Sequence, residues 1–296
     1  MTTLSFPLAN ERLGIICMIG AMFLFAAADA HAKFLTASFH PVQIIWFRQA
    51  GLSLGVFYLL YRHGPSLLQS SQRSLQLARG ILAIGSSVLF VFAVKYVALA
   101  DAVAASFVAP FFVTILGVLV LGEKVGPRRW SAVVVGFIGA LIIVRPGLGV
   151  VHPAVMLVVL AAAIYAARQV VGRVLSRTDQ TLTTIVYTAL TSSALISIPL
   201  PLFWKTPDSQ LLWLLLVSMS VLASLGEVLL IKALECAEAA SVAPMHYTLI
   251  IWGTIYGYLF FGQFPDRWTW IGTAIIIAAG LYTFRREKVS NPNTVS

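Results

Sequence analysis

Long apolar stretches follow one another along the whole chain and are separated by short polar turns. A helix needs about 20 mostly apolar residues to cross the hydrocarbon core of a bilayer. Ten stretches qualify: residues 13–35, 41–61, 77–97, 100–121, 129–146, 153–174, 182–203, 210–231, 238–260 and 267–284. Turn-forming Pro and Gly residues mark most of the breaks between them. The pattern predicts an all-α integral membrane protein with ten transmembrane helices.

Composition supports a lipid environment. Of 296 residues, 59% are hydrophobic and only 10% are charged, whereas about a quarter are charged in an ordinary soluble domain. The mean hydropathy is +0.90. Both cysteines, Cys17 and Cys236, lie in or beside apolar segments, so we expect packing roles and no disulfide. The first apolar stretch is too long for a signal peptide and contains Asp29.

Positive charges predict the orientation of the chain. With the N-terminus in the cytoplasm, 14 of the 20 Lys and Arg residues fall in inner segments and 5 in outer segments, while Arg48 lies within a span. Both termini are therefore expected in the cytoplasm, as in a multi-pass protein of the bacterial inner (plasma) membrane. This bias accounts for the net charge of +9, so no nucleic-acid partner is needed.

The chain repeats itself at an offset of 140 residues. The matched positions, first half before second half, are Thr114 and Thr254, Ile115 and Ile255, Gly117 and Gly257, Leu119 and Leu259, Gly122 and Gly262, Trp130 and Trp270, Leu141 and Leu281, and Arg145 and Arg285. Chance similarity between glycine-rich apolar helices is the alternative explanation. If the repeat is genuine, each half holds five spans, and because five is odd the second half enters the membrane inverted.

The repeat predicts the domain organisation and the class of function. We expect a first five-helix repeat over residues 1–148, a second over 149–288 and a disordered tail over 289–296. Inverted halves can exchange between inward-open and outward-open arrangements, which is a device of secondary transporters. The sequence contains no His and Cys cluster for a metal, no phosphate loop and no nucleophile elbow, so we expect no enzyme, no metal and no cofactor.

The end of the first half carries a family resemblance. A span ending in Leu121-Gly122-Glu123 is followed by a short basic turn, Trp130 and a glycine-bearing span that reaches Arg145-Pro146-Gly147. This arrangement resembles the EamA-type repeat of the drug/metabolite transporter superfamily, over essentially the whole chain. The second copy departs from it with Phe261-Gly262-Gln263. The chain looks closest to bacterial amino-acid exporters of the YddG kind. The resemblance implies ten helices, cytoplasmic termini and a central substrate cavity.

Ionisable residues within spans are energetically expensive, so they are the first candidates for a transport site. Asp29 and Arg48 lie at comparable depths from the outer side, so an ion pair between them is geometrically possible. Arg168 and Glu227 lie towards the cytoplasmic ends of their spans. Asp29 and Glu227 are the candidates for a proton relay. Structural pairing, or extension of a long side chain towards the headgroups, is the alternative role.

Prolines and aromatic residues supply the remaining candidates. Pro110 and Pro244 interrupt the fourth span of each half, and carbonyl groups freed at such breaks can face a substrate, although a simple kink would also explain them. Aromatic and polar residues at helical spacing complete the predicted mid-membrane cavity, although core or lipid contacts would also explain the phenylalanines: Phe107, Phe111, Tyr165, Gln169, His246 and Tyr247.

These expectations combine into one functional hypothesis. The chain would export amino acids, aromatic or other apolar ones in particular, and related small metabolites by alternating access. Export of drugs, nucleosides or other metabolites is the alternative within the superfamily. A membrane-embedded enzyme or a lipid scramblase is the alternative outside it. The expected partners are a small-molecule substrate and membrane lipids, and the oligomeric state is open between monomer and homodimer.

Overall fold

The computed structural model describes residues 11–123, 125–145, 152–237 and 242–290, and within these ranges the regular structure is entirely helical. The helices of the first half are α1 (Glu11–Leu35), α2 (Pro41–His63), η1 (Pro65–Leu68), α3 (Arg73–Val94), α4 (Leu99–Ser106), α5 (Ala109–Leu121) and α6 (Pro127–Val144). Those of the second half are α7 (Val155–Leu175), α8 (Thr181–Ser197), α9 (Leu200–Phe203), α10 (Gln210–Cys236), η2 (Ala243–Tyr247), α12 (Thr248–Phe261) and α13 (Arg267–Ser290).

Six described helical segments are long and apolar enough to cross a membrane, with α4 and α5 counted as one segment. Two shorter apolar helices lie within α6 and α8. Large hydrophobic side chains such as Leu54, Phe57, Leu119 and Leu202 are exposed on the outer faces of the bundle. Exposed apolar surface on this scale fits a lipid environment.

The fourth span is broken where the sequence predicts an interruption. Its helix ends at Ser106 and a new helix begins at Ala109, with Pro110 in its first turn, where a missing N–H is harmless. The matching segment of the second half starts as the 3-10 helix η2, which contains Pro244, before α12 begins at Thr248. The two halves therefore break the same helix near the same place.

Both halves end this broken helix with the same glycine cap. The Glu123 N–H donates to the carbonyl of Gly117 at 3.2 Å, and the Gln263 N–H donates to the carbonyl of Gly257 at 3.0 Å. The residue before each donor is a left-handed glycine, φ 67° at Gly122 and 62° at Gly262. A left-handed glycine is a common way to end a helix, because glycine has no Cβ to clash in this conformation. The match at an offset of 140 residues is thus a structural repeat and not a chance similarity.

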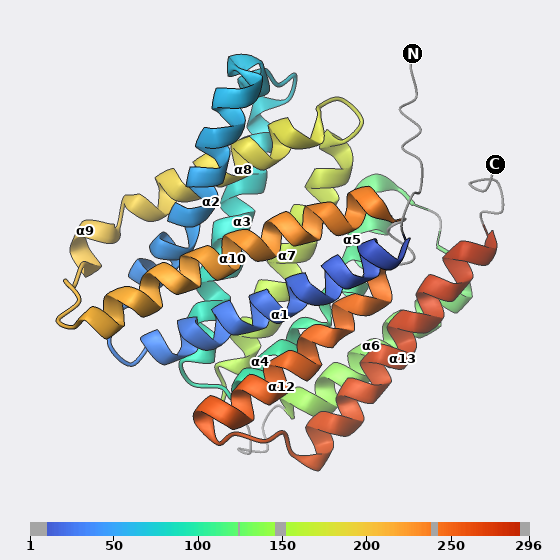
Figure 1. Cartoon of the computed structure of the whole chain (residues 1–296). Helices are drawn as coiled ribbons and strands as arrows, with labels where there is room; N and C mark the ends of the chain where they lie inside the picture. The colour runs from blue at the N-terminus through green and yellow to red at the C-terminus, as the bar shows by residue number, and fades with distance from the viewer. Residues whose placement is uncertain (1–10, 124, 146–151, 238–241, 291–296) are drawn as a thin grey trace.

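The last helices of the two halves, α6 and α13, lie side by side along one edge of the bundle (Figure 1). Gly139 of α6 packs against Ile275 and Ile276 of α13, whereas Ile143, one turn further along α6, packs against Gly272. A later residue on one helix thus meets an earlier residue on the other. These two counterpart helices are antiparallel.

The second helices of the halves, α2 and α8, are also antiparallel where they touch. The indole N–H of Trp46 donates to Ser197 Oγ at 2.9 Å, and Ser53 Oγ lies 2.7 Å from Ser193 Oγ. Ser53 and Ser193 are themselves separated by 140 positions, which is the repeat offset. A contact between equivalent residues of two repeats lies on the axis that relates them.

The broken fourth helices repeat this relation. Val103 of α4 faces Gly253 of α12, and Ala100 faces Gly257. The remaining packing pairs exchange under the same operation: α1 lies on α10 and α12 as α7 lies on α3 and α5 (Figure 1).

The C-terminal helix extends slightly further than predicted. α13 continues to Ser290, so the expected tail at 289–296 begins at least two residues too early. The rest of that tail, residues 291–296, lies outside the described part of the chain.

Candidate functional site

Asp29 and Arg48 form an ion pair between α1 and α2. One Arg48 Nη donates to Asp29 Oδ1 at 2.7 Å. The Asp29 side chain is 9% exposed and that of Arg48 is 23% exposed. The contact that the sequence made geometrically possible is therefore present. Its partners neutralise each other about two turns from the connected ends of α1 and α2, at a depth where an unpaired charge would be costly.

Lys33, one turn after Asp29, has a different role. Its ammonium group donates to the carbonyls of Val94 and Val97, at 2.8 and 2.5 Å. Val94 is the last residue of α3 and Val97 lies in the turn that follows, so the cation also complements the helix dipole there. Lys33 ties α1 to the end of α3 and is a structural residue.

A second polar group lies on one face of α7, nearer the opposite end of the bundle. Gln169 Nε2 donates to the hydroxyl of Tyr165 at 3.2 Å, and the guanidinium carbon of Arg168 lies 4.8 Å from the Tyr165 ring centroid. The Nε of Arg168 is buried and has no hydrogen-bond partner. These three predicted site residues are in mutual contact.

Arg79 of α3, which is not among the predicted site residues, joins this group. One of its terminal nitrogens donates to Thr188 Oγ1 on α8. Its Nε lies beside Gly172 of α7, one turn after Arg168, and Arg168, Tyr165 and Glu227 are within electrostatic range of its guanidinium. The available signal was its position, two residues inside the span predicted over 77–97.

The aromatic candidates lie apart from the charged ones. The ring of Phe107 stacks on that of Tyr247, with centroids 5.0 Å apart and planes at 26°. The Tyr247 hydroxyl meets Gly280 on α13, and the ring of Phe111 packs against Gly136 on α6. These rings fill the junction with the last helix of each half. Half-buried His246 precedes Tyr247 in η2.

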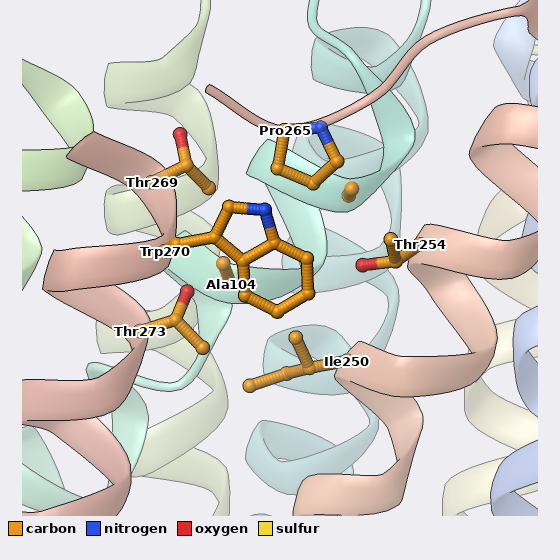
Figure 2. A pocket seen from close by; sticks show the side chains of 8 residues that line it. Ala104, Ile250, Thr254, Pro265, Thr269, Trp270 and Thr273 are labelled. Carbon is orange, nitrogen blue, oxygen red and sulfur yellow. The ribbon is translucent and has the colours of Figure 1, made fainter. Parts of the chain in front are cut away.

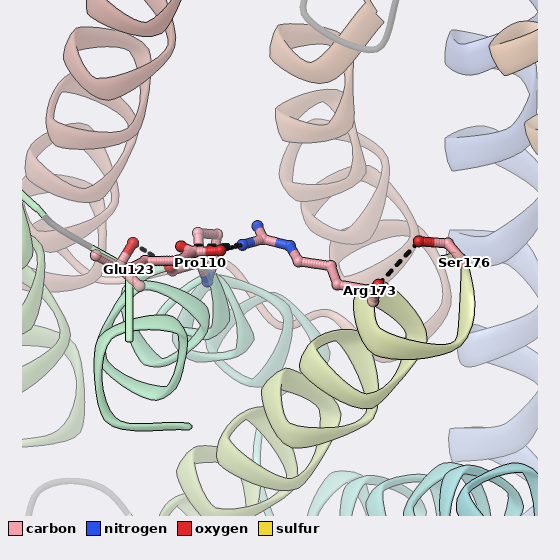
Figure 3. A network of polar contacts seen from close by, with 5 residues as sticks. Pro110, Glu123, Arg173 and Ser176 are labelled. Carbon is pink, nitrogen blue, oxygen red and sulfur yellow. Dashed lines mark hydrogen bonds and ion pairs between the residues drawn. The ribbon is translucent and has the colours of Figure 1, made fainter. Parts of the chain in front are cut away.

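Pro110 lies in the first turn of α5 and is exposed, and its carbonyl accepts a hydrogen bond from Thr114 Oγ1 at 3.2 Å. Figure 3 also draws a polar network that lies beyond the other end of the same helix. There Arg173 of α7 donates to both oxygens of Glu123, at 3.2 and 3.4 Å. Both side chains are partly exposed, 45% and 33%, so the pair itself stabilises the fold little. It links the end of α5 to the end of α7.

Two pockets of the described residues lie away from these polar groups. One, between α4, α12 and α13, is lined by Ala104, Thr254 and Trp270 among others and is too narrow for a water molecule (Figure 2). The other has a volume of about 400 Å³ and lies between the α2–α3 and α7–α8 connections, beside Asp179. There hydrogen bonds from Ser70, Gln76 and Ser71 lower the pKa of Asp179 to about 2.

The fold and its buried charges define a class of protein: a multi-pass helical membrane protein with a duplicated core and charged residues between its helices. The chain belongs to the EamA-like transporter family, whose model matches residues 12–145 and again 152–285.

Named relatives cover nearly the full length of the chain. It is 28% identical to an S-adenosylmethionine uptake transporter of Rickettsia prowazekii, over 94% of each chain. It is 30% identical to the pseudopaline exporter CntI of Pseudomonas aeruginosa, over 94% of this chain and 98% of that one. A riboflavin transporter of Vibrio cholerae is 31% identical over 89% and 90% of the two chains. The family and these relatives are transporters, not enzymes.

One solved crystal structure has the same fold. It matches with a TM-score of 0.63 at 17% identity, over 93% of this chain and 98% of the other.

Proposed function

We propose that this chain is a secondary transporter that exports amino acids and related small metabolites across the bacterial inner membrane by alternating access. In this proposal ten helices span the membrane with both termini in the cytoplasm. They form two inverted repeats, over residues 1–148 and 149–288.

The antiparallel contacts of three helices with their counterparts carry the proposal. α2 meets α8, α4 meets α12 and α6 meets α13 in opposite directions, with Ser53 against Ser193 at the centre. Halves related in this way can exchange roles, and a site between them is then exposed to each side in turn. The ion pair of Arg145 with Asp266, at 2.6 Å, lies near one end of the bundle, and that of Glu123 with Arg173 lies near the other.

The polar residues on α1, α2, α7 and α10 form the proposed transport site: Asp29, Arg48, Tyr165, Arg168, Gln169 and Glu227. Asp29 and Glu227 remain the proposed proton-relay residues. Phe111 packs against α6, and Tyr247, on which Phe107 stacks, packs against α13, so we assign all three to the scaffold and not to the substrate cavity.

Amino acids remain our preferred substrates because arginines inside the bundle can hold a carboxylate. One relative is named for S-adenosylmethionine, which is itself an amino-acid derivative. Other metabolites are the second candidate, since a further relative is named for riboflavin.

Transport by the purified protein in proteoliposomes tests the proposal. A panel of labelled amino acids, S-adenosylmethionine and riboflavin is offered to vesicles with and without the protein. We expect protein-dependent flux of at least one amino acid. Flux of riboflavin alone would replace the substrate assignment, and protein-dependent movement of lipid between leaflets without solute flux would refute a transporter of this kind.

A further inference from the structure

The side chain of Arg79 turns into the bundle and does not extend towards the end of its helix. Besides its hydrogen bond to Thr188 on α8, it lies flat against α7, where a Cβ added to Gly172 would stand 3.3 Å from its Nε. The absence of a side chain at Gly172 leaves room for the guanidinium. Arg79 is thus held at the junction of α3, α7 and α8.

Arg168 reaches the same junction from α7. It precedes Gly172 by four positions, so the two residues share a face of the helix. The guanidinium of Arg168 lies over the ring of Tyr165 and is within electrostatic range of Arg79. Two cations, one from α3 and one from α7, therefore lie against the same stretch of α7, where they repel each other.

Neither guanidinium is fully hydrogen-bonded by the described part of the chain. The Nε of Arg79 and the Nε of Arg168 are buried without a hydrogen-bond partner, and neither arginine forms an ion pair with a described carboxylate. Glu227 is near enough to act on the charge of Arg79, but one carboxylate leaves the cluster with an excess positive charge. An uncompensated cation inside a membrane protein costs several kcal/mol, so a second anion would stabilise the cluster.

We infer that Arg79 and Arg168 together bind the carboxylate of the transported substrate, with Tyr165 beside them to contact its apolar part. This inference rests on the proposed function and adds Arg79 as a substrate-binding residue. A guanidinium offers a planar fork that matches a carboxylate, and it stays charged at every relevant pH. The outer arginine, Arg48, is less suited because Asp29 already occupies it.

Paired ligands with and without a carboxylate test the inference on the purified full-length protein. Binding of phenylalanine and of phenylalaninamide, and of leucine and leucinamide, is measured by calorimetry in detergent. The wild type should bind each acid at least about tenfold more tightly than its amide, as expected for hydrogen bonds to a charged group. Arg79→Gln and Arg168→Gln should each weaken acid binding about tenfold or more and leave amide binding unchanged.

A matched control removes the same charge at an exposed position. Arg177 lies just after α7 and is exposed, so Arg177→Gln should bind the acids as the wild type does. If a glutamine variant is poorly folded, Arg79→Lys and Arg168→Lys keep the charge but lose the fork, and weaker acid binding by these folded variants supports the site equally.

Three results would overturn the inference. The first is equal binding of acids and amides by the wild type, and the second is acid binding that survives both glutamine substitutions. The third is competition in which chloride or phosphate displaces a bound amino acid as effectively as another amino acid does. The last would identify a general anion site. Transport measured in parallel separates the two proposals. Selective carboxylate binding without any flux refutes the transporter proposal alone, and flux that is insensitive to both substitutions refutes the carboxylate site alone.

Discussion

The ion pair between Asp29 and Arg48 makes a quantitative prediction about folding. Asp29→Asn keeps the shape of the side chain but leaves the Arg48 guanidinium, only 23% exposed, without its anion. Breaking a buried pair from one side destabilises by about 3–5 kcal/mol, and insertion of an arginine at a helix centre costs about 2.5–3.5 kcal/mol. We therefore expect Asp29→Asn to lower the free energy of unfolding by about 3 kcal/mol, which is more than a hundredfold in the folding equilibrium.

The double variant Asp29→Asn/Arg48→Gln should recover at least half of this loss, because it removes the unpaired charge as well. Unfolding by SDS in mixed micelles measures the loss of stability of Asp29→Asn, of Arg48→Gln and of the double variant, which together with the wild type form a double-mutant cycle. A double variant as unstable as the sum of the two single variants would refute the reasoning. Arg48→Lys, which keeps the charge without the fork, should insert normally and transport more weakly. Full transport by this variant would leave the pair a purely structural role.

Four further predictions concern packing, symmetry, pH and orientation. Gly272→Leu should lower the free energy of unfolding by about 1–3 kcal/mol, because a Cβ there meets the backbone of α6 at 2.6 Å. Gly55 has open space around it, so Gly55→Ala should leave the free energy of unfolding unchanged. SDS unfolding measures both variants. Ser53→Cys/Ser193→Cys should crosslink on oxidation, as judged by diagonal electrophoresis, since the two hydroxyls are 2.7 Å apart; a chain that stays uncrosslinked would contradict the proposed axis. The pKa of Asp179 is lowered from 3.8 to about 2 in the folded protein. The carboxylate therefore contributes fully to stability above pH about 4, and this contribution is lost as the pH falls from about 4 to 2. Asp179→Asn should remove that part of the pH dependence of unfolding. A C-terminal alkaline phosphatase fusion should be inactive and a fluorescent-protein fusion bright; the reverse would contradict a cytoplasmic C-terminus.

Elements set by local chemistry could be predicted from the sequence. The glycine at 122 and at 262 ends a helix because a left-handed residue is needed there, and the sequence repeats it. The contact of Asp29 with Arg48 followed from equal depth on consecutive helices, since a buried carboxylate and a buried guanidinium each need a partner. The break at Pro110 followed from the missing N–H of proline.

The faces of the helices could not be predicted in the same way. Periodicity groups Phe107 and Phe111 on one side of a helix, but it does not tell which neighbour that side meets. In the structure they pack among Tyr247 and the last helices of the halves. Arg79 was missed because a charge near a span end can extend to the headgroups or turn inward. The direction it takes depends on Gly172 and Thr188, which are distant in sequence.

Counterflow tests the transporter proposal most directly. Proteoliposomes are loaded with unlabelled amino acid and diluted into a trace of the same labelled amino acid, so no coupling ion is required. The proposal predicts a transient, protein-dependent accumulation of label above equilibrium for at least one amino acid, reduced in Arg168→Gln and unchanged in Arg177→Gln. Equilibration without overshoot for every amino acid tested, with correctly folded and inserted protein, would contradict it.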